Sequence, residues 1–154
     1  MRGVAGVPET PAPLVSVVMS VRNGERFLRS AIDSILCQTL ERLELIVIDD
    51  GSSDGTPEIL AGIDDPRFRT MRRDHAGLAA ALNAGIRAAR AELIARMDSD
   101  DEAIPARLER QFDFLQAHPD LGSKAKMAAA SVQEQAGAGL DHLSESEFQR
   151  FQSL

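Results

Sequence analysis

The stretch LELIVIDDGSSDG at residues 43–55 joins an apolar run to a cluster of acidic and small residues. A second stretch of the same design, LIARMDSDD, occupies residues 93–101. Each apolar run has the length and composition of a strand. The sequence therefore predicts two strands that both end in carboxylates.

Strand and helix patterns alternate four times between residues 14 and 117. Strands are predicted at residues 14–20, 43–48, 67–71 and 93–97. The first helix is predicted to follow Asn23 as its N-cap, and the second to have Thr56 as its N-cap and Pro57 as its first residue. The third is predicted to span residues 78–90, and the fourth to begin at Pro105. Such alternation is typical of βαβ units. It predicts an α/β fold, with a Rossmann-like, mostly parallel sheet flanked by helices.

Polar side chains gather where these strands end. In a parallel α/β sheet, ligands bind outside the carboxyl ends of the strands. Carboxylates as close as those at positions 98–101 repel one another unless a cation lies among them, and hard oxygen ligands suit Mg²⁺ or Mn²⁺. We therefore expect one shared metal-nucleotide site, formed by strand-end residues Ser20, Asp49, Asp50, Asp98 and Asp100.

Composition limits the partners. The chain has 154 residues, which favours one domain, and a formal net charge of −7. That charge argues against a nucleic-acid partner, because a phosphate backbone needs a basic surface. The single cysteine, Cys37, lies on an apolar helical pattern and is predicted to be a buried structural thiol.

The ends of the chain differ from its middle. Residues 1–13 are predicted to be a flexible leader, residues 14–122 one domain, and residues 123–154 an atypical tail that is partly disordered or helical. No signal peptide and no membrane-spanning run is evident. The expected location is the cytoplasm, with attachment to the inner face of a membrane left open.

Several short segments occur together in a fixed order. They are VSVVMSVRN at 15–23, SILCQT at 34–39, ELIVIDDGSSDGT at 44–56, LNAGI at 82–86, MDSDD at 97–101 and PARLERQ at 105–111. In this order they resemble the nucleotide-binding half of family-2 glycosyltransferases, which have the GT-A fold. The resemblance extends from Val15 to Gly122.

The resemblance implies a reaction and roles for individual residues. The family transfers a sugar from a nucleotide-diphosphate donor, here expected to be UDP-linked, to an acceptor with inversion at the anomeric carbon. Ser20 and Arg22 would border the base, and Asp49 would hydrogen-bond its edge. Asp98 would face the ribose and the metal. Asp100, the second acid of the DXD motif, would be the principal ligand of Mn²⁺ or Mg²⁺.

The chain departs from the family pattern in two places. Arg22 stands where the family usually has an aromatic residue, although a guanidinium can also stack on a flat ring. No counterpart of the acceptor half or of its general base is recognisable after Gly122, so the catalytic base is unknown. The chain is therefore interpreted as truncated or completed by a partner chain. The alternative function is a catalytically inactive donor-binding or interaction module.

Structural alternatives remain open for some residues. The segment from Asp49 to Ser52 also fits an ordinary turn, and Glu25 also fits a charge that complements a helix dipole. Asn83 and His75 are weaker site candidates. Two other classes of protein fit poorly. A phosphoacceptor receiver domain needs a lysine after a late strand, and no lysine precedes Lys124 in this sequence. A dinucleotide-binding dehydrogenase needs a G-x-G-x-x-G turn after the first strand, and this sequence has none there.

Overall fold

The computed structural model describes residues 11–120. Strands and helices alternate along this part as predicted. They are β1 (Val15–Val21), α1 (Leu28–Leu36), β2 (Leu43–Asp50), α2 (Thr56–Ala61), β3 (Phe68–Arg73), α3 (Leu78–Ala88), β4 (Leu93–Asp98) and α4 (Arg107–Ala117). The predictions for the tail at residues 123–154, and for most of the leader, lie outside the described residues.

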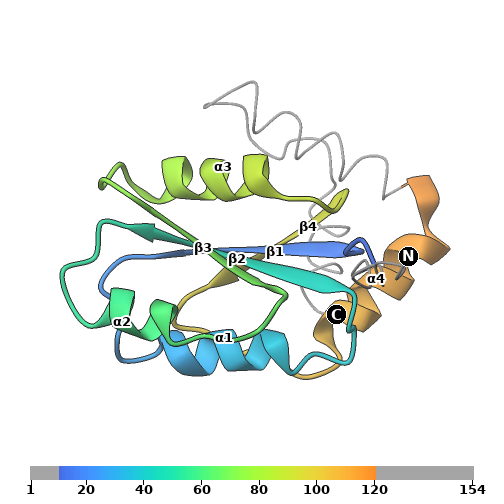
Figure 1. Cartoon of the computed structure of the whole chain (residues 1–154). Helices are drawn as coiled ribbons and strands as arrows, with labels where there is room; N and C mark the ends of the chain where they lie inside the picture. The colour runs from blue at the N-terminus through green and yellow to red at the C-terminus, as the bar shows by residue number, and fades with distance from the viewer. Residues whose placement is uncertain (1–10, 121–154) are drawn as a thin grey trace, which may run out of the picture.

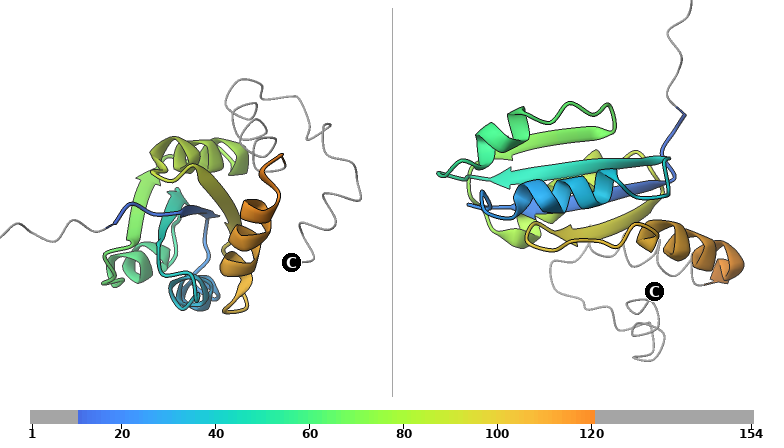
Figure 2. Two further views of the ribbon diagram at one scale, coloured as in Figure 1. Left: turned by 90° about the vertical axis from the view of Figure 1, so that its right-hand side faces the viewer. Right: turned by 90° about the horizontal axis from the view of Figure 1, so that it is seen from below.

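The four described strands form one sheet in the order β3-β2-β1-β4, and every neighbouring pair is parallel. Helix α3 covers one face of this sheet, whereas α1 and α2 lie on the other (Figure 1). Helix α4 lies on the α1 side, next to β4 (Figure 2), and its Leu108 joins the same core as α1. The predicted α/β fold with a parallel sheet is confirmed.

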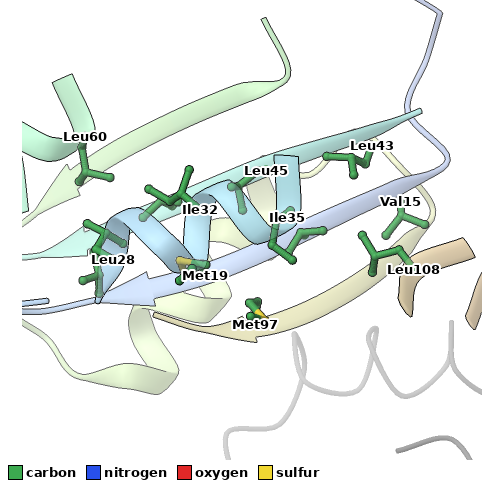
Figure 3. Close-up of a cluster of buried hydrophobic side chains, with 14 residues drawn as sticks. Val15, Met19, Leu28, Ile32, Ile35, Leu43, Leu45, Leu60, Met97 and Leu108 are labelled. Atoms are coloured by element: carbon green, nitrogen blue, oxygen red, sulfur yellow. The ribbon is translucent and has the colours of Figure 1, made fainter. Parts of the chain in front are cut away.

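Strand β2 is buried along its whole length because it lies inside the sheet with helices on both faces. Its side chains alternate between two cores. Leu45 and Val47 point into the larger core with α1 (Figure 3), whereas Ile46 and Ile48 pack beneath Ala81 of α3. This alternation decides which face of the sheet each side chain at the end of β2 points toward.

Helix α3 packs very closely on the sheet because of one glycine. A Cβ atom on Gly85 would come within 2.4 Å of Val18 Cγ1 and 3.4 Å of Ile48 Cγ1. No larger residue fits without moving the helix away from β1 and β2. Gly85 thus sets the depth at which α3, and the loop before it, lies over the sheet.

Glu44 forms a buried polar hub at the amino end of the sheet, which sequence reasoning missed. It accepts hydrogen bonds from the Ser16 hydroxyl (2.6 Å), the Arg90 backbone N–H (2.6 Å) and the Arg69 guanidinium (2.8 Å). Burial raises the pKa of Glu44, but these three donors outweigh burial and leave its pKa below the ordinary value. The hub joins β1, β2 and β3 to the connection between α3 and β4.

Three local predictions differ from the structure. Helix α1 begins at Leu28, so Asn23 is not its N-cap; Asn23 instead has a φ of 53°. Helix α2 includes Thr56 as its first residue, with Gly55 as the N-cap. Cys37 is exposed rather than buried, because α1 ends at Leu36 and its buried stripe faces away from position 37.

In the part of the chain that the structure describes, no helix is both long enough and apolar enough to cross a membrane.

Candidate functional site

The strand order changes direction between β1 and β4. From β1 the chain moves outward through β2 to β3, and it then returns through α3 to place β4 on the other side of β1. The connections after β1 and before β4 therefore lie on opposite faces of the sheet (Figure 1). Open α/β sheets bind ligands outside the carboxyl ends of the strands at such a reversal of strand order.

Three predicted site residues lie on the same side of the sheet at this point. Ser20 of β1 is the register partner of Asp98 of β4, so their Cα atoms are direct neighbours across the parallel pair. Met19 and Met97 point into the α1-side core, and the strand alternation therefore turns Ser20 and Asp98 toward the α3 side. Arg22 reaches the same side, where its Nη1 lies 3.2 Å from His75 Nε2.

Asp49 is not brought together with those three residues. It follows Ile48, which points to the α3 side, so Asp49 turns to the α2 side. Its Oδ1 accepts the Ser52 backbone N–H (2.9 Å), and its Oδ2 lies 3.5 Å from Arg72 Nη1. Oδ2 is shielded from solvent and has no hydrogen bond. Asp49 thus stabilises the turn after β2, and its side chain is only 2% exposed.

Asp50 occupies the α3 side and is the carboxylate that β2 places beside Arg22. Its Oδ1 accepts the Ala76 N–H (3.0 Å), and its Oδ2 accepts the Gly77 N–H (2.9 Å) and contacts His75 Nδ1 (2.7 Å). Burial raises the pKa of Asp50, but these hydrogen bonds outweigh burial and hold it below the ordinary value. Asp50 therefore pins the loop that leads into α3.

Gly51 makes the approach of that loop possible. It has a φ of +77°, and a Cβ atom at this position would lie 3.0 Å from the His75 backbone nitrogen. Both the backbone conformation and the available space favour glycine. The loop after β3 can therefore lie directly over the carboxyl end of β2.

Two other loops are joined by five hydrogen bonds that involve backbone N–H groups. The loop after β1 donates from Asn23, Gly24 and Glu25 to side chains of the loop after β2; in return, Ser53 N–H donates to Asn23 Oδ1 and Gly55 N–H to Glu25 Oε2. Glu25 therefore complements the N-terminus of α2 rather than that of its own helix. This pairing fixes the backbone from which Arg22 extends.

The predicted metal ligands lie on an exposed turn. Asp98 Oδ1 accepts hydrogen bonds from Arg96 Nη2 (2.7 Å) and Nε (3.2 Å), and the side chain of Asp98 is 48% exposed. Asp100 is exposed. Within residues 11–120 no three metal-ligating side chains meet closely enough to hold an ion. The two carboxylates fit an ion that arrives with phosphate oxygens and keeps some waters, as Mg²⁺ commonly does.

The segment after this turn is anchored to α1 and β4. The buried Gln38 donates from its amide nitrogen to the Ile104 carbonyl (2.7 Å) and accepts the Leu108 N–H on its amide oxygen (2.9 Å). Arg107 donates to the Arg96 carbonyl (3.2 Å). These contacts give the glutamine of the SILCQT segment and the arginine of PARLERQ a structural role, which is to hold the chain on either side of the acidic turn.

Sequence reasoning underestimated two residues of this site. Asp50 was grouped with Asp49 but given no role, and His75 was only a weak candidate. The signal was present in the order of elements, because the loop containing His75 follows the carboxyl end of β3 and must return across the sheet to reach α3. The alternation of β2 side chains would have separated Asp50 from Asp49.

These features define an α/β domain of the GT-A type. The family model described as glycosyl transferase family 2 matches residues 16–143, so the chain belongs to this family. The match extends beyond residue 122; the domain boundary predicted there stays a prediction.

Individual relatives agree with this family. EpsH of Bacillus subtilis (strain 168), named as a glycosyltransferase, is 40% identical over 115 residues, which are 73% of this chain and 33% of EpsH. The succinoglycan biosynthesis protein ExoO of Rhizobium meliloti (strain 1021) is 37% identical over 143 residues, which are 92% of this chain and 40% of ExoO. The chain thus spans about a third to two fifths of the length of these relatives.

Solved structures show the same fold. Residues 1–349 of S. aureus TarS in complex with UDP-GlcNAc match with a TM-score of 0.63 at 23% identity, over 68% of this chain and 31% of TarS. The mannosyltransferase PcManGT from Pyrobaculum calidifontis, in complex with GDP-Man and Mn²⁺, matches with a TM-score of 0.61 at 28% identity, over 73% of this chain and 34% of that protein.

Proposed function

We propose that this chain supplies the donor site of a metal-dependent glycosyltransferase that binds a nucleotide-diphosphate sugar and transfers the sugar to an acceptor with inversion. The observation that carries this proposal is the convergence of Ser20, Arg22, Asp50 and Asp98 on one side of the crevice beside β1 and β4. Family membership and a neighbour in complex with GDP-Man and Mn²⁺ support the same reading.

In this proposal the base lies beside Arg22 at the end of β1. A guanidinium is planar and weakly hydrated, so it can stack on a nucleobase where an aromatic ring would otherwise do so. Asp50 takes the role that the sequence predicted for Asp49, which is to accept a hydrogen bond from the base edge. Its position supports this, because Asp50 lies on the face of Arg22 and contacts His75, whereas Asp49 lies on the other face.

Asp98 and Asp100 are the residues that would hold Mn²⁺ or Mg²⁺. Such an ion neutralises the charge that builds on the leaving diphosphate and thereby assists its departure. The side chains of this chain hold the donor by its base at one end and its phosphates at the other, and they orient the anomeric carbon toward the acceptor. Arg96 would release Asp98 Oδ1 as the ion binds.

The acceptor and the general base are not assigned. Inversion requires a carboxylate that takes the proton of the acceptor hydroxyl while the bond from the anomeric carbon to the phosphate oxygen breaks. Because the relatives are more than twice as long as this chain, the rest of the site can come from further sequence or from a partner chain. A donor-binding module without turnover is the competing function.

Calorimetric titration of the full chain with UDP-GlcNAc and with GDP-Man, each with and without Mn²⁺, tests the proposal. We expect one donor to bind at least about tenfold more tightly with Mn²⁺, and the Asp100→Asn variant to lose this difference while it keeps its circular dichroism spectrum. Asp113→Asn, a change on an exposed residue of α4, is the matched control. Absence of binding to a folded chain would overturn the proposal, and binding without sugar transfer would favour the donor-binding module.

The same titration separates the two candidate base carboxylates. Asp50→Asn should weaken donor binding at least about tenfold, whereas Asp49→Asn should change it less than about threefold. The Mn²⁺ dependence should persist in both variants, since neither residue is assigned to the ion. The reverse order of effects would return the base contact to Asp49.

A further inference from the structure

Arg22 is held by a single residue that belongs to a distant part of the chain. Its Nη1 donates to His75 Nε2 at 3.2 Å, across 53 positions of sequence. Arg22 is an exposed residue with a long side chain, so without an anchor it would sample many rotamers. The contact with His75 selects an orientation that carries the guanidinium over the end of the sheet, beside the proposed base position.

His75 is itself held in place although its side chain is 49% exposed. Its Nδ1 lies 2.7 Å from Asp50 Oδ2, and the backbone N–H groups of Ala76 and Gly77 bind the same carboxylate. Gly51 lets the His75 backbone lie directly against the end of β2. The ring therefore stands at a fixed point between Asp50 and Arg22.

The chemistry of its two neighbours defines the protonation of the ring. A guanidinium only donates hydrogen bonds, and a carboxylate only accepts them. The imidazole must therefore carry its hydrogen on Nδ1, facing Asp50, and a lone pair on Nε2, facing Arg22. This arrangement exists only for the neutral ring. After protonation, Nε2–H would face a guanidinium N–H, so that donor meets donor and two positive charges adjoin.

The charged groups around His75 are Asp50 of β2, Arg22 after β1, Arg73 of β3 and the adjacent Asp74. Arg73 Nε lies 3.4 Å from Asp50 Oδ1. The carboxylates favour a charged ring and the guanidinium groups oppose it. Protonation would thus keep the contact between His75 and Asp50 and break the contact between His75 and Arg22.

We infer that His75 is a positioning residue of the donor site, which holds Arg22 for the nucleobase only while its ring is neutral, so that donor binding weakens in mildly acidic solution. This inference rests on the proposed function. Imidazole is the side chain whose charge ordinarily changes between about pH 5 and pH 8, which is the range to test. Asp50, whose pKa is held below its ordinary value, remains ionised there.

Donor affinity as a function of pH tests the inference. The full chain is titrated with UDP-GlcNAc and GDP-Man at saturating Mn²⁺, from about pH 8 to about pH 5.5. The diphosphate of a nucleotide sugar does not titrate in this range, so the probe keeps its charge. We expect the affinity of the native chain to fall about five- to tenfold, the effect of losing one stacked guanidinium.

Substitutions of His75 and Arg22 test whether this pair of residues causes the pH dependence of donor affinity. In His75→Gln the amide oxygen can accept from Arg22 at every pH, so affinity at pH 8 should be retained and the pH dependence lost. Arg22→Ala should bind weakly at every pH. His118→Gln is the matched control, because His118 follows α4 and, among the described residues, its ring hydrogen-bonds its own helix at the Phe114 carbonyl (2.8 Å). It should keep the native pH profile.

A measurement without ligand tests the same contact directly. Nitrogen-15 NMR of the ligand-free chain at about pH 8 should show the Nδ1–H tautomer for the ring signal that disappears in His75→Gln. An Nε2–H tautomer, or a pH dependence that persists in His75→Gln, overturns the inference and leaves the proposed function standing. Failure of both donors to bind at pH 8 overturns the proposed function and the inference together.

Discussion

The carboxyl ends of β2 and β4 look alike in the sequence but differ in the structure. Both strands end in acidic residues, yet the side chains of Asp49 and Asp50 are 2% and 4% exposed, whereas that of Asp98 is 48% exposed. Asp50 accepts two backbone N–H groups and contacts His75, whereas Asp98 contacts one arginine, which is itself 56% exposed. The comparison separates carboxylates that build the site from carboxylates that remain accessible to a cation.

The reason lies in the position of each strand. Strand β2 is inside the sheet, and the loops after β1 and β3 both cross its end. Strand β4 is at the edge of the described sheet, and among the described residues the donors to the Asp98 carboxylate come from the Arg96 side chain. A carboxylate beneath crossing loops finds backbone donors, whereas one on an edge strand remains hydrated.

The largest effect expected from this difference is on stability. Asp50→Asn should lower the free energy of unfolding by about 2 to 4 kcal/mol, because an amide has one acceptor oxygen and its NH₂ group would face the N–H of Ala76 or Gly77. Asp100→Asn should change it by less than about 0.5 kcal/mol. Urea denaturation followed by circular dichroism measures both, since the chain has no Trp or Tyr. Equal effects would remove the distinction between the two strand ends.

A second prediction concerns stability at low pH. Its expected effect is smaller, because it covers only the part of the Asp50 contribution that depends on the charge of the carboxylate. The pKa of Asp50 is held below its ordinary value of 3.8, so its charge stabilises the fold above that value and the contribution is lost as pH falls through the lowered pKa. The stability of Asp50→Asn should therefore depend less steeply on pH below about pH 4 than that of the native chain. Glu44→Gln should likewise make the free energy of unfolding depend less steeply on pH, because the pKa of Glu44 is also lowered. A profile of Asp50→Asn parallel to that of the native chain would contradict this account.

The smallest effect is expected at the carboxyl end of β4, where Asp98 is accessible. Arg96→Gln removes the guanidinium from Asp98 Oδ1 and should strengthen Mn²⁺ binding by at most about fivefold, since an exposed ion pair is worth about 0 to 1 kcal/mol. Stability should be nearly unchanged. Titration of Mn²⁺, followed by the relaxation of water protons, measures the affinity. Arg110→Gln, a change at an exposed residue of α4, is the matched control. Weaker Mn²⁺ binding in Arg96→Gln would show that this arginine supports the site instead of competing for it.

The amino-acid sequence was sufficient to predict the layers of the fold. Apolar runs at β1 and β2 and the helical stripe of α1 follow local periodicities, which are set by the geometry of strands and helices. The turn after β1 was less predictable. Asn23 has the residue type of an N-cap, yet here it accepts a hydrogen bond from Ser53, a contact 30 positions away. Cys37 was misplaced because its helix ends one residue before it.

For the candidate site, the sequence determined which strands end in carboxylates, because a residue's place along a strand follows from local pattern. Tertiary structure decided what each carboxylate does. It placed Asp98 beside Ser20 and brought His75 between Asp50 and Arg22. Strand order, register and the path of the returning loops fix these contacts. They arise between residues far apart in the chain, whereas a local pattern carries information only about near neighbours.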